Sequence, residues 1–468
     1  MPIDLRFDSA ETPLVTDLYE LTMAASYFEI GFNGPSCFSM SARRLPQRRG
    51  FLVAAGIERL VEALEQFRFE QSALDYLESL KLFAPDFLAF LSRLRFSGEV
   101  FAMPEGTIFF GQEPIVEVRA PLIEAQLLET LVINQIGMAS LIASKAARSV
   151  IAASGRALVD FGLRRSQGID AGLIAARSSY LAGFIGTSNV LAGRRYGIPL
   201  YGTMAHSYIM AHDGERAAFE HFVKTFPKLS TLLVDTYETV HGVENAARTA
   251  IELRRRGGEL GAIRLDSGDL FDLSVKARRI LDQNGLQDTR IFASGNLDEY
   301  RISELVEAQA PIDGFGVGTA MVVSDDAPAL DVAYKLSDYA GVPRMKTSQH
   351  KLSLPGAKQV FRAFDAAGRF YADIIGLASE EPGAVYGDFS PAPANVIMLL
   401  QKQFSCGHRV EPRPKLDDSR DFLRNSLNRL DPSYKDLERP GAYPISYSTA
   451  FARILERATR DAETRQSG

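Results

Sequence analysis

The sequence predicts an α/β protein whose central part is a parallel sheet or barrel of strand-and-helix units. Three short apolar runs in this part start at residues 262, 290 and 312, so consecutive runs are 28 and 22 residues apart. That spacing is the length of one strand plus a crossover helix, the unit of parallel sheets. Hydrophobic residues make up 46% of the chain and charged residues 24%, which is typical of globular proteins. The 468 residues suffice for two or three domains.

The N-terminal part, residues 12–150, is expected to be mostly helical with short extended pieces. Thr16 or Asp17 can cap a helix, because its side chain can accept from free N–H groups and a periodic apolar face follows. Residues 122–153 carry Leu, Ile and Ala at helical spacing with few breakers. This pattern predicts one long buried helix or two abutting helices that join two domains.

From about residue 156 the chain has short apolar runs that end in Gly, Ser, Asp or Thr, each followed by a helical stretch. We expect each run to be a strand, so the polar and glycine residues collect where the strands end. In parallel α/β folds that edge carries the ligand site. The predicted strands are residues 157–161, 199–203, 231–235, 262–266, 290–294 and 312–317.

Charge and cysteine content exclude several partners and compartments. The chain has 52 Lys and Arg against 58 Asp and Glu, a net charge of −6, and lacks the broad basic surface that nucleic acid requires. Cys37 and Cys406 cannot form a disulfide framework or a four-cysteine zinc site. No secretory signal is visible, and no uncharged apolar stretch is long enough to span a bilayer. We expect a cytoplasmic protein without nucleic-acid or membrane partners.

A histidine follows one predicted strand directly, in the segment Gly202-Thr-Met-Ala-His206. A histidine at a strand end, beside small residues, can carry a proton or act as a nucleophile. A histidine bonded to a backbone carbonyl is an equally good interpretation of this lone motif. The other histidines of this region lack zinc-ligand spacing and are expected to be structural; they are His212, His221 and His241.

The segment Ile263-Arg264-Leu-Asp266-Ser-Gly-Asp269 places one arginine and two aspartates in a strand-to-helix turn. Burial of these charges requires that they pair with each other or with a ligand. Asp266 and Asp269 can hold Mg²⁺ directly or through water. In the alternative interpretation Asp269 caps the next helix and Asp266 pairs with Arg264. The residues alone leave both interpretations open.

Two glycine-containing loops follow consecutive predicted strands, at Ser294-Gly295-Asn and at Gly316-Val-Gly318-Thr319. Glycine lets the backbone approach a phosphate, and free N–H groups at a helix start point toward it. Two such loops on neighbouring units predict a phosphate cup at a barrel rim. Alternatively, Asp298 and Glu299 satisfy the dipole of the first of these helices without a ligand.

Arginines form two clusters. Arg164 and Arg165 follow the strand predicted at 157–161 and can bind phosphate or carboxylate oxygens bidentately, whereas a solvated surface pair is the ordinary alternative. The second cluster, expected to lie in a solvated loop, consists of Arg43, Arg44, Arg48 and Arg49.

Six motifs occur in the order seen in nicotinate phosphoribosyltransferases, and the chain resembles that family from about residue 12 to residue 365. The resemblance weakens beyond, and the part from about residue 405 has no motif to transfer. The motifs are Thr16-Asp-Leu-Tyr19-Glu, Phe161-Gly-Leu-Arg-Arg165, Gly186-Thr-Ser-Asn-Val-Leu-Ala-Gly193, Gly202-Thr-Met-Ala-His206-Ser, Arg264-Leu-Asp-Ser-Gly-Asp269 and Lys351-Leu-Ser-Leu-Pro-Gly-Ala-Lys-Gln-Val360.

The resemblance implies the fold of a type II phosphoribosyltransferase that acts as a homodimer. This fold is an irregular parallel α/β barrel with a second α/β domain built from the N-terminal and later segments. The implied divisions are an N-terminal α/β domain at 1–130 and a barrel catalytic domain at 131–345. Residues 346–468 then return to the N-terminal domain and add a C-terminal helical surface subdomain.

The resemblance also implies the reaction. Such enzymes transfer the phosphoribosyl group of 5-phosphoribosyl 1-diphosphate to nicotinate, which gives nicotinate mononucleotide and diphosphate for NAD biosynthesis. ATP is a co-substrate, whose coupling classes these enzymes with ligases, and Mg²⁺ is the cofactor. By resemblance His206 is the histidine that ATP phosphorylates, and Asp266 and Asp269 act in catalysis near Mg²⁺.

The substrate-binding residues are likewise implied by the resemblance. Tyr19 stacks on the pyridine ring, with Leu163 or Phe161 as a second wall, and Thr203 and Arg264 line the nicotinate pocket. The residues implied to face the phosphates of the sugar diphosphate are Arg164, Ser294, Gly295, Gly318, Thr319 and Lys351.

Three rival functions are less well supported by the residues. A nicotinamide phosphoribosyltransferase needs a carboxylate that accepts from the carboxamide, and the pocket motifs offer no clear candidate. A quinolinate enzyme needs extra cationic residues for a second carboxylate and usually has a shorter chain. A barrel that has lost catalysis has no need to keep His206, both aspartates and both glycine loops together.

Overall fold

The computed structural model describes residues 9–228, 230–347, 353–385 and 392–466. The chain forms two compact units. We call Ile142–Pro328 the parallel unit, and Met1–Leu141 with Ala329–Gly468 the antiparallel unit, after their main sheets. Lys351, a predicted phosphate-facing residue, lies outside the described residues.

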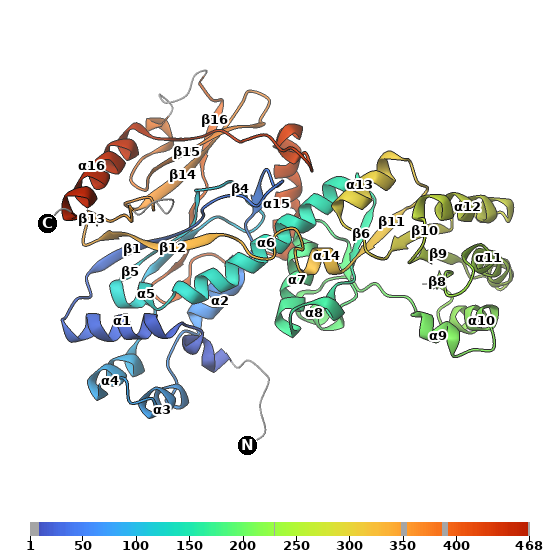
Figure 1. Cartoon of the computed structure of the whole chain (residues 1–468), viewed down its shortest axis with the longest axis horizontal. Coiled ribbons are helices and arrows are strands. Elements are labelled where there is room, and N and C mark those ends of the chain that lie inside the picture. Colours follow the sequence, from blue (N-terminus) through green and yellow to red (C-terminus); the bar gives the residue numbers. More distant parts are fainter. Residues whose placement is uncertain (1–8, 229, 348–352, 386–391, 467–468) are drawn as a thin grey trace. The chain divides into compact units, whose positions relative to one another are not determined.

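The parallel unit is built on a six-stranded sheet of order β7-β6-β11-β10-β9-β8, in which every pair is parallel (Figure 1). The register places Ser294 beside Gly316, so the loops after β10 and β11 leave from the same edge. The predicted α/β class is confirmed. The strands are β6 (Ala157–Asp160), β7 (Gly186–Thr187), β8 (Ser230–Leu233), β9 (Leu260–Leu265), β10 (Arg290–Ser294) and β11 (Gly314–Val317).

Helices follow the strands and pack against the sheet through one apolar face. In α12 the buried residues Leu270, Ser274, Ala277 and Leu281 recur every three or four positions, and the helix packs on β9 and β10. The helices are α7 (Ile169–Ala182), α8 (Val190–Tyr196), α9 (His206–Met210), α10 (Glu215–Thr225), α11 (Thr239–Arg255), α12 (Leu270–Gln283), α13 (Glu299–Glu307) and α14 (Thr319–Val322), with a 3-10 turn at Leu163–Arg165.

The prediction of a strand at residues 199–203 is wrong. Leu200 forms only an isolated bridge with Thr187, and β7 is the edge strand in its place. Pro199 has no N–H to donate to a ladder, and the apolar run that follows it is only two residues long. His206 therefore follows a loop that lies along β7 rather than a strand.

The antiparallel unit contains a seven-stranded sheet of order β13-β12-β1-β5-β3-β17-β18 and a four-stranded sheet of order β16-β14-β15-β19. In the first sheet β1 (Pro35–Ala42) pairs with β5 (Pro114–Pro121) and with β12 (Val332–Tyr339), so both ends of the chain contribute to one sheet. The N-terminal part has the expected helices, but β1 and β5 are eight residues each and so are longer than the short extended pieces expected. Over residues 39–42 serines alternate with apolar residues, a two-residue period that favours strands.

The remaining elements of this unit come from both of its chain segments. Its other strands are β2 (Leu52–Val53), β3 (Glu99–Ala102), β4 (Ile108–Phe109), β13 (Val342–Pro343), β14 (Lys358–Phe364), β15 (Phe370–Leu377), β16 (Asn395–Met398), β17 (Gln401–Ser405), β18 (His408–Arg409) and β19 (Ile445–Tyr447). Its helices are α1 (Leu18–Glu29), α2 (Ile57–Glu65), α3 (Gln71–Ser79), α4 (Pro85–Arg93), α5 (Leu122–Gln126), α15 (Leu416–Arg429) and α16 (Thr449–Gln466), with 3-10 turns at Ser9–Leu14, Pro382–Ala384 and Pro432–Lys435.

The apolar segment 122–153 forms two abutting helices, α5 and α6 (Glu129–Ala153), which is one of the two predicted arrangements. The segment is long and apolar enough to cross a membrane, but 67% of its most apolar window is buried inside the protein, as in the core helix of a soluble protein. The division between the units falls after Leu141, within α6, whereas the expected domain boundary at 130/131 lies in its first turn.

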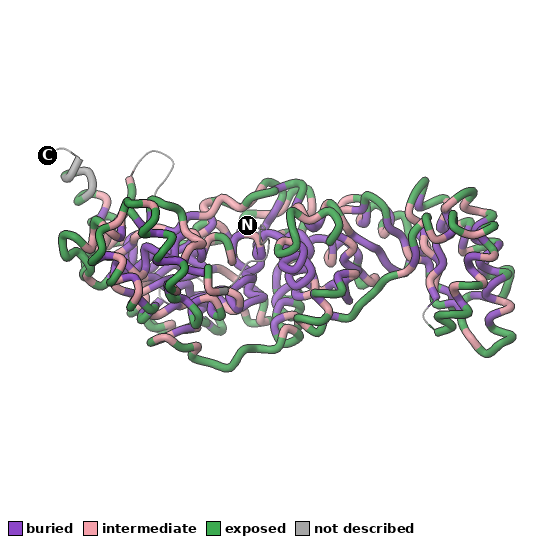
Figure 2. Tube along the Cα trace, turned by 90° about the horizontal axis from the view of Figure 1, so that it is seen from below, coloured by how far each residue is buried: buried purple, intermediate pink, exposed green. Residues whose placement is uncertain are grey.

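Each unit has a buried interior (Figure 2). In the antiparallel unit this interior includes a charged group: Arg362 on β14 pairs with Asp373 on β15, with side chains 2% and 0% exposed. The guanidinium also donates to the backbone oxygen of Ile108 at 2.8 Å and lies 4.3 Å from the centre of the Phe370 ring. The pair is therefore closed on all sides by protein groups.

Candidate active site

His206 lies at the carboxyl edge of the parallel sheet, where residues from two neighbouring strand ends hold its ring. Its Nδ1 lies 3.1 Å from the Thr236 hydroxyl, in the loop after β8. Its Nε2 lies 3.9 Å from Asp266 Oδ2, directly after β9. The side chain is 41% exposed, so the ring is oriented by the protein and still open to a ligand.

Arg264, near the end of β9, joins the predicted site residues into one network. Its Nε donates to the Ser294 hydroxyl at 2.8 Å, one Nη donates to Thr203 Oγ1 at 3.2 Å, and the other donates to Asp266 Oδ1 at 2.6 Å. The guanidinium carbon lies 5.2 Å from the centre of the Phe161 ring. Phe161, rather than Leu163, is thus the apolar neighbour of the arginine.

Asp266 is held as a carboxylate. Burial alone would raise its pKa, but the hydrogen bond from Ser294 and the positive charge of Arg264 outweigh burial and lower the pKa below its usual range. Its charge therefore persists at neutral pH beside His206, where it can orient an imidazole proton or face a cation.

Asp269 lies at the start of α12 and caps that helix. Its Oδ1 accepts from the backbone N–H groups of Phe271 and Asp272 at 3.1 and 3.2 Å. This cap and the pairing of Asp266 with Arg264 are the contacts of the alternative interpretation of this turn. Both capping bonds use Oδ1, which leaves Oδ2 of the exposed Asp269 outside the cap.

Asp235 and Thr236 are site residues that the sequence reasoning missed. Asp235 Oδ2 accepts from the backbone N–H of Asp266 at 2.9 Å and from the Ser267 hydroxyl at 2.6 Å, so it fixes the turn after β9. Its Oδ1 is buried without a hydrogen-bond partner. The available signal was their position at the end of the strand predicted at 231–235, the same signal that singled out the other site residues.

The two glycine loops leave adjacent strands of the same edge. Gly295 has a φ of +92°, and a Cβ atom there would lie 1.9 Å from the backbone oxygen of Asp266, so only glycine fits. Gly318 precedes Thr319, the first residue of α14. Asp298 caps α13 by accepting from the backbone N–H of Arg301 at 2.7 Å, so this helix start already has a carboxylate partner, as in the alternative interpretation.

The donor set fits a magnesium ion that arrives with a phosphate ligand better than a permanent metal. Among the residues that the structure describes, no group of three or more His, Cys, Asp or Glu side chains is placed to hold a metal ion. Mg²⁺ commonly uses one or two carboxylates together with substrate phosphates and water. Asp266 and Asp269 can supply those carboxylates.

Three other predicted site residues are exposed: Tyr19, Leu163 and Arg164. Tyr19 is on α1 of the antiparallel unit and is 45% exposed; burial and the negative charge of Glu129 raise its pKa, so it is a neutral phenol at pH 7. Leu163 and Arg164 are exposed on the 3-10 turn after β6. His212, expected to be structural, contacts the backbone oxygen of Tyr208 at 2.8 Å.

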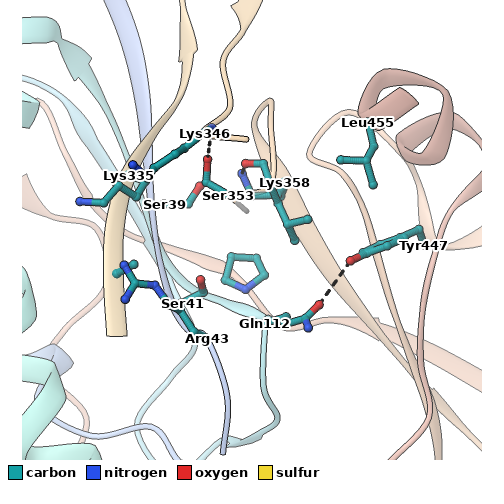
Figure 3. A pocket seen from close by; sticks show the side chains of 13 residues that line it. Ser39, Ser41, Arg43, Gln112, Lys335, Lys346, Ser353, Lys358, Tyr447 and Leu455 are labelled. Carbon is teal, nitrogen blue, oxygen red and sulfur yellow. Dashed lines mark hydrogen bonds between the residues drawn. The ribbon is translucent and has the colours of Figure 1, made fainter. Parts of the chain in front are cut away.

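The antiparallel unit holds a basic cavity of about 320 Å³ (Figure 3). Arg43, from the cluster expected to be a solvated loop, lines this cavity, and Arg49 of the same cluster is buried and donates to the backbone oxygen of Leu141. The solvated interpretation is wrong for these two arginines. The cationic and hydroxyl side chains of the cavity are Arg43, Lys335, Lys346, Lys358, Ser39, Ser41, Ser353 and Tyr447.

Comparison with known proteins places the chain in a family. The model described as "Nicotinate phosphoribosyltransferase (NAPRTase) family" matches residues 156–347, and the N-terminal and C-terminal domain models of the same enzyme match residues 14–137 and 357–455. The chain is 47% identical to the nicotinate phosphoribosyltransferase pncB2 of Mycobacterium tuberculosis, over 97% of this chain and 95% of that protein. The chain belongs to the nicotinate phosphoribosyltransferase family.

Further members support this assignment. The nicotinate phosphoribosyltransferase of Bacillus subtilis is 37% identical over 95% of both chains. The crystal structure of human nicotinic acid phosphoribosyltransferase superposes with a TM-score of 0.83 at 31% identity and covers 94% of this chain and 99% of the human one. The resemblance and fold class expected from the sequence are confirmed, and the family match extends past residue 365 into the C-terminal part, where no motif had been found.

Proposed function

We propose that this nicotinate phosphoribosyltransferase, an enzyme of NAD salvage, couples phosphoribosyl transfer to ATP through His206. The observation that carries the proposal is the convergence of His206, Arg264 and Asp266 at one sheet edge, in a family member that is 47% identical to a curated nicotinate phosphoribosyltransferase. The substrates are nicotinate, 5-phosphoribosyl 1-diphosphate and ATP.

The transfer step joins the ring nitrogen of nicotinate to the anomeric carbon of the sugar. The bond from that carbon to diphosphate breaks, and the diphosphate leaves with the electron pair. The transition state resembles an oxocarbenium ion, so the nucleophile must be held in line and the leaving group's charge neutralised. Arg264 supplies a fixed cation, and Phe161 beside it offers an aromatic face for the pyridine ring. The family resemblance assigns stacking on the pyridine ring to Tyr19 as well.

ATP coupling uses His206 as the acceptor of a phosphoryl group. A ring nitrogen attacks the γ-phosphorus, the bond to ADP breaks, and water later releases the phosphate. Thr236 and Asp266 fix the plane of the ring before the reaction, which reduces the reorganisation needed for an in-line attack. The new dianion lies near Arg264 and alters the charge that the sugar diphosphate meets.

Mg²⁺ would neutralise charge on the diphosphate and would be held by Asp266 and Asp269. The glycine loops at Gly295 and Gly318, with Ser294 and Thr319, offer backbone N–H and hydroxyl groups to the sugar phosphate. Arg164 adds an exposed cation after β6.

The basic cavity of the antiparallel unit is a second place for phosphate groups. Four cationic side chains and several hydroxyls surround it, a composition that favours a polyanion. Lys358 is fixed there by Glu117 at 3.2 Å, and the backbone N–H of Lys346 donates to the Ser353 hydroxyl at 2.9 Å. Lys351 is close in sequence to both lysines.

A homodimer and a cytoplasmic location complete the proposal, on the strength of the family resemblance and the acidic, cysteine-poor chain.

One assay tests the function. Turnover of 5-phosphoribosyl 1-diphosphate is measured with nicotinate, nicotinamide or quinolinate, each with and without ATP. We expect turnover with nicotinate and stimulation of it by ATP. Preference for another base overturns the substrate assignment, and equal rates with and without ATP overturn the coupling. Labelled γ-phosphate on the wild-type chain but not on His206→Ala identifies the phosphorylated residue.

A further inference from the structure

A buried lysine contacts carboxylates from the segments that follow both glycine loops. Lys145 on α6 is 1% exposed, and its Nζ contacts Glu299 at 2.8 Å and both Asp325 and Asp326 at 2.9 Å. Burial alone would lower the pKa of this ammonium, but the three carboxylates outweigh burial and raise it, so the group stays charged. Arg148, three residues further along α6, binds the other oxygen of Glu299 at 2.9 Å.

The three carboxylates belong to the two segments that follow the glycine loops. Glu299 is the first residue of α13, four residues after Gly295. Asp325 and Asp326 come just after α14, the short helix that begins at Thr319. The backbone N–H of Asp325 bonds to the oxygen of Ala320, so this turn is tied to the start of α14.

We propose that Lys145 is a positioning residue for the phosphate of the sugar diphosphate, because it sets the distance between the two glycine loops. A single ammonium gathers carboxylates from both loop segments, and the strands before the loops are already neighbours in the sheet. Each loop is therefore fixed at its start by its strand, β10 or β11, and in the segment that follows it by the contact with Lys145. This inference rests on the proposed phosphate site of the glycine loops.

The arrangement explains why a charge stands at this position. A buried ion pair is often no more stable than an apolar substitute, so stability alone does not require a lysine here. An ammonium has three donors, and at this position it has three carboxylate partners, which an apolar side chain cannot replace in direction or distance. A looser cup binds its phosphate less well while the reacting groups at His206 and Arg264 stay in place.

The test compares Lys145→Met and Lys145→Arg in the full-length enzyme. We expect Lys145→Met to raise the KM for 5-phosphoribosyl 1-diphosphate about tenfold, with the KM for nicotinate and the kcat each changed less than about threefold. Lys145→Arg, which keeps the charge, is expected to recover most of the affinity. Arg278→Met is the matched control, because Arg278 also ties a helix to a loop of this unit, through the backbone oxygens of Leu286 and Thr289.

The outcomes separate this inference from the proposed function. If wild-type enzyme uses the sugar diphosphate but Lys145→Met only lowers the melting temperature, as Arg278→Met should, the positioning role is wrong and the function stands. If wild-type enzyme does not use the sugar diphosphate, the proposed function fails first. Should Lys145→Met not fold, the outer partners decide: Asp325→Asn with Asp326→Asn is expected to raise the same KM about threefold, and an unchanged KM overturns the proposal.

Discussion

Two arginine–aspartate pairs, one in each unit, differ in what surrounds them. Arg362 and Asp373 are 2% and 0% exposed, and aromatic rings and a backbone carbonyl close the pair off. Arg264 and Asp266 are 14% and 24% exposed, and their other partners are the hydroxyls of Thr203 and Ser294 and the ring of His206. The same two residue types hold two strands together in one unit and, in our proposal, build the reaction site in the other. The two pairs differ in access to solvent rather than in charge pairing, and on this ground we propose a catalytic role for the exposed pair and a structural role for the buried one.

The largest expected effect is on stability, in the closed pair. Arg362→Met leaves the carboxylate of Asp373 buried without its cation, and we expect a loss of about 3–5 kcal/mol in the free energy of unfolding. Urea denaturation measures this loss. The folded fraction should keep wild-type KM values, and a normal unfolding free energy would show that the pair is not a structural support.

The partly exposed pair of Arg264 and Asp266 should give the opposite result, a loss of activity with little loss of stability. Arg264→Met removes a cation that touches three site residues, and we expect kcat/KM for nicotinate to fall about 100-fold or more, which corresponds to about 3 kcal/mol of transition-state stabilisation. The midpoint of urea denaturation should change little, because both partners reach solvent. Large destabilisation with near-normal turnover per folded molecule would contradict the comparison. Arg264→Lys is the control that keeps the charge but loses the three directed donors of the guanidinium.

Thr236 gives a smaller effect that is confined to ATP coupling. Thr236→Val keeps the shape of the side chain but removes the hydroxyl that contacts His206 Nδ1, so the ring loses one of its two supports. We expect ATP-stimulated turnover to fall about tenfold and ATP-independent turnover to remain. Thr236→Ser should restore the stimulation. Equal losses with and without ATP would mean that Thr236 supports the loop and not the ring.

The smallest effect concerns Glu113, beside the closed pair. Burial and the negative charge of Asp373 raise the pKa of Glu113 well above its usual range. The folded state therefore keeps a proton that the unfolded state releases, and stability falls as pH rises from the usual carboxyl pKa toward the folded one. Glu113→Gln removes this dependence. The change in unfolding free energy is about 1.4 kcal/mol for each tenfold difference between the acid dissociation constants of Glu113 in the folded and unfolded states.

Thermal unfolding at pH 4 and pH 8 measures the effect of Glu113→Gln. The variant should match wild type at pH 4 and be more stable at pH 8. Lower stability of the variant at both pH values would show that the carboxyl group has a partner that an amide cannot replace. Asp365→Asn is a control, because hydrogen bonds from Arg369 lower the pKa of the Asp365 carboxyl, which is the opposite direction to the shift of Glu113.

The sequence predicted most of the parallel unit because its strands are short apolar runs with polar ends. Five of the six predicted runs are strands, and His206, Arg264 and Asp266 meet where those strands end. The run at 199–203 failed because proline cannot donate to a ladder. Thr236 and Asp235 were missed because a threonine or aspartate at a strand end is common and gains meaning only from its neighbour in space.

The antiparallel unit was less predictable for a different physical reason. Its main sheet pairs β1 with β12, nearly 300 residues later in the chain, so no local pattern specifies the partner. The basic cavity likewise combines residues from β1, β12, β14 and α16. From the sequence alone, Arg43 was therefore expected to be solvated, because its cavity neighbours come from distant parts of the chain.

The contact between Gly295 and the backbone oxygen of Asp266 has a consequence for protein engineering. In many barrel enzymes the loops at the sheet edge can be exchanged one at a time to change specificity. Here any side chain at position 295 would overlap the main chain of Asp266, in the loop after β9. The loops after β9 and β10 are thus one module, and a graft that transplants either of them alone will bring a mismatched surface. New specificities on this scaffold should be sought by exchanging both loops together.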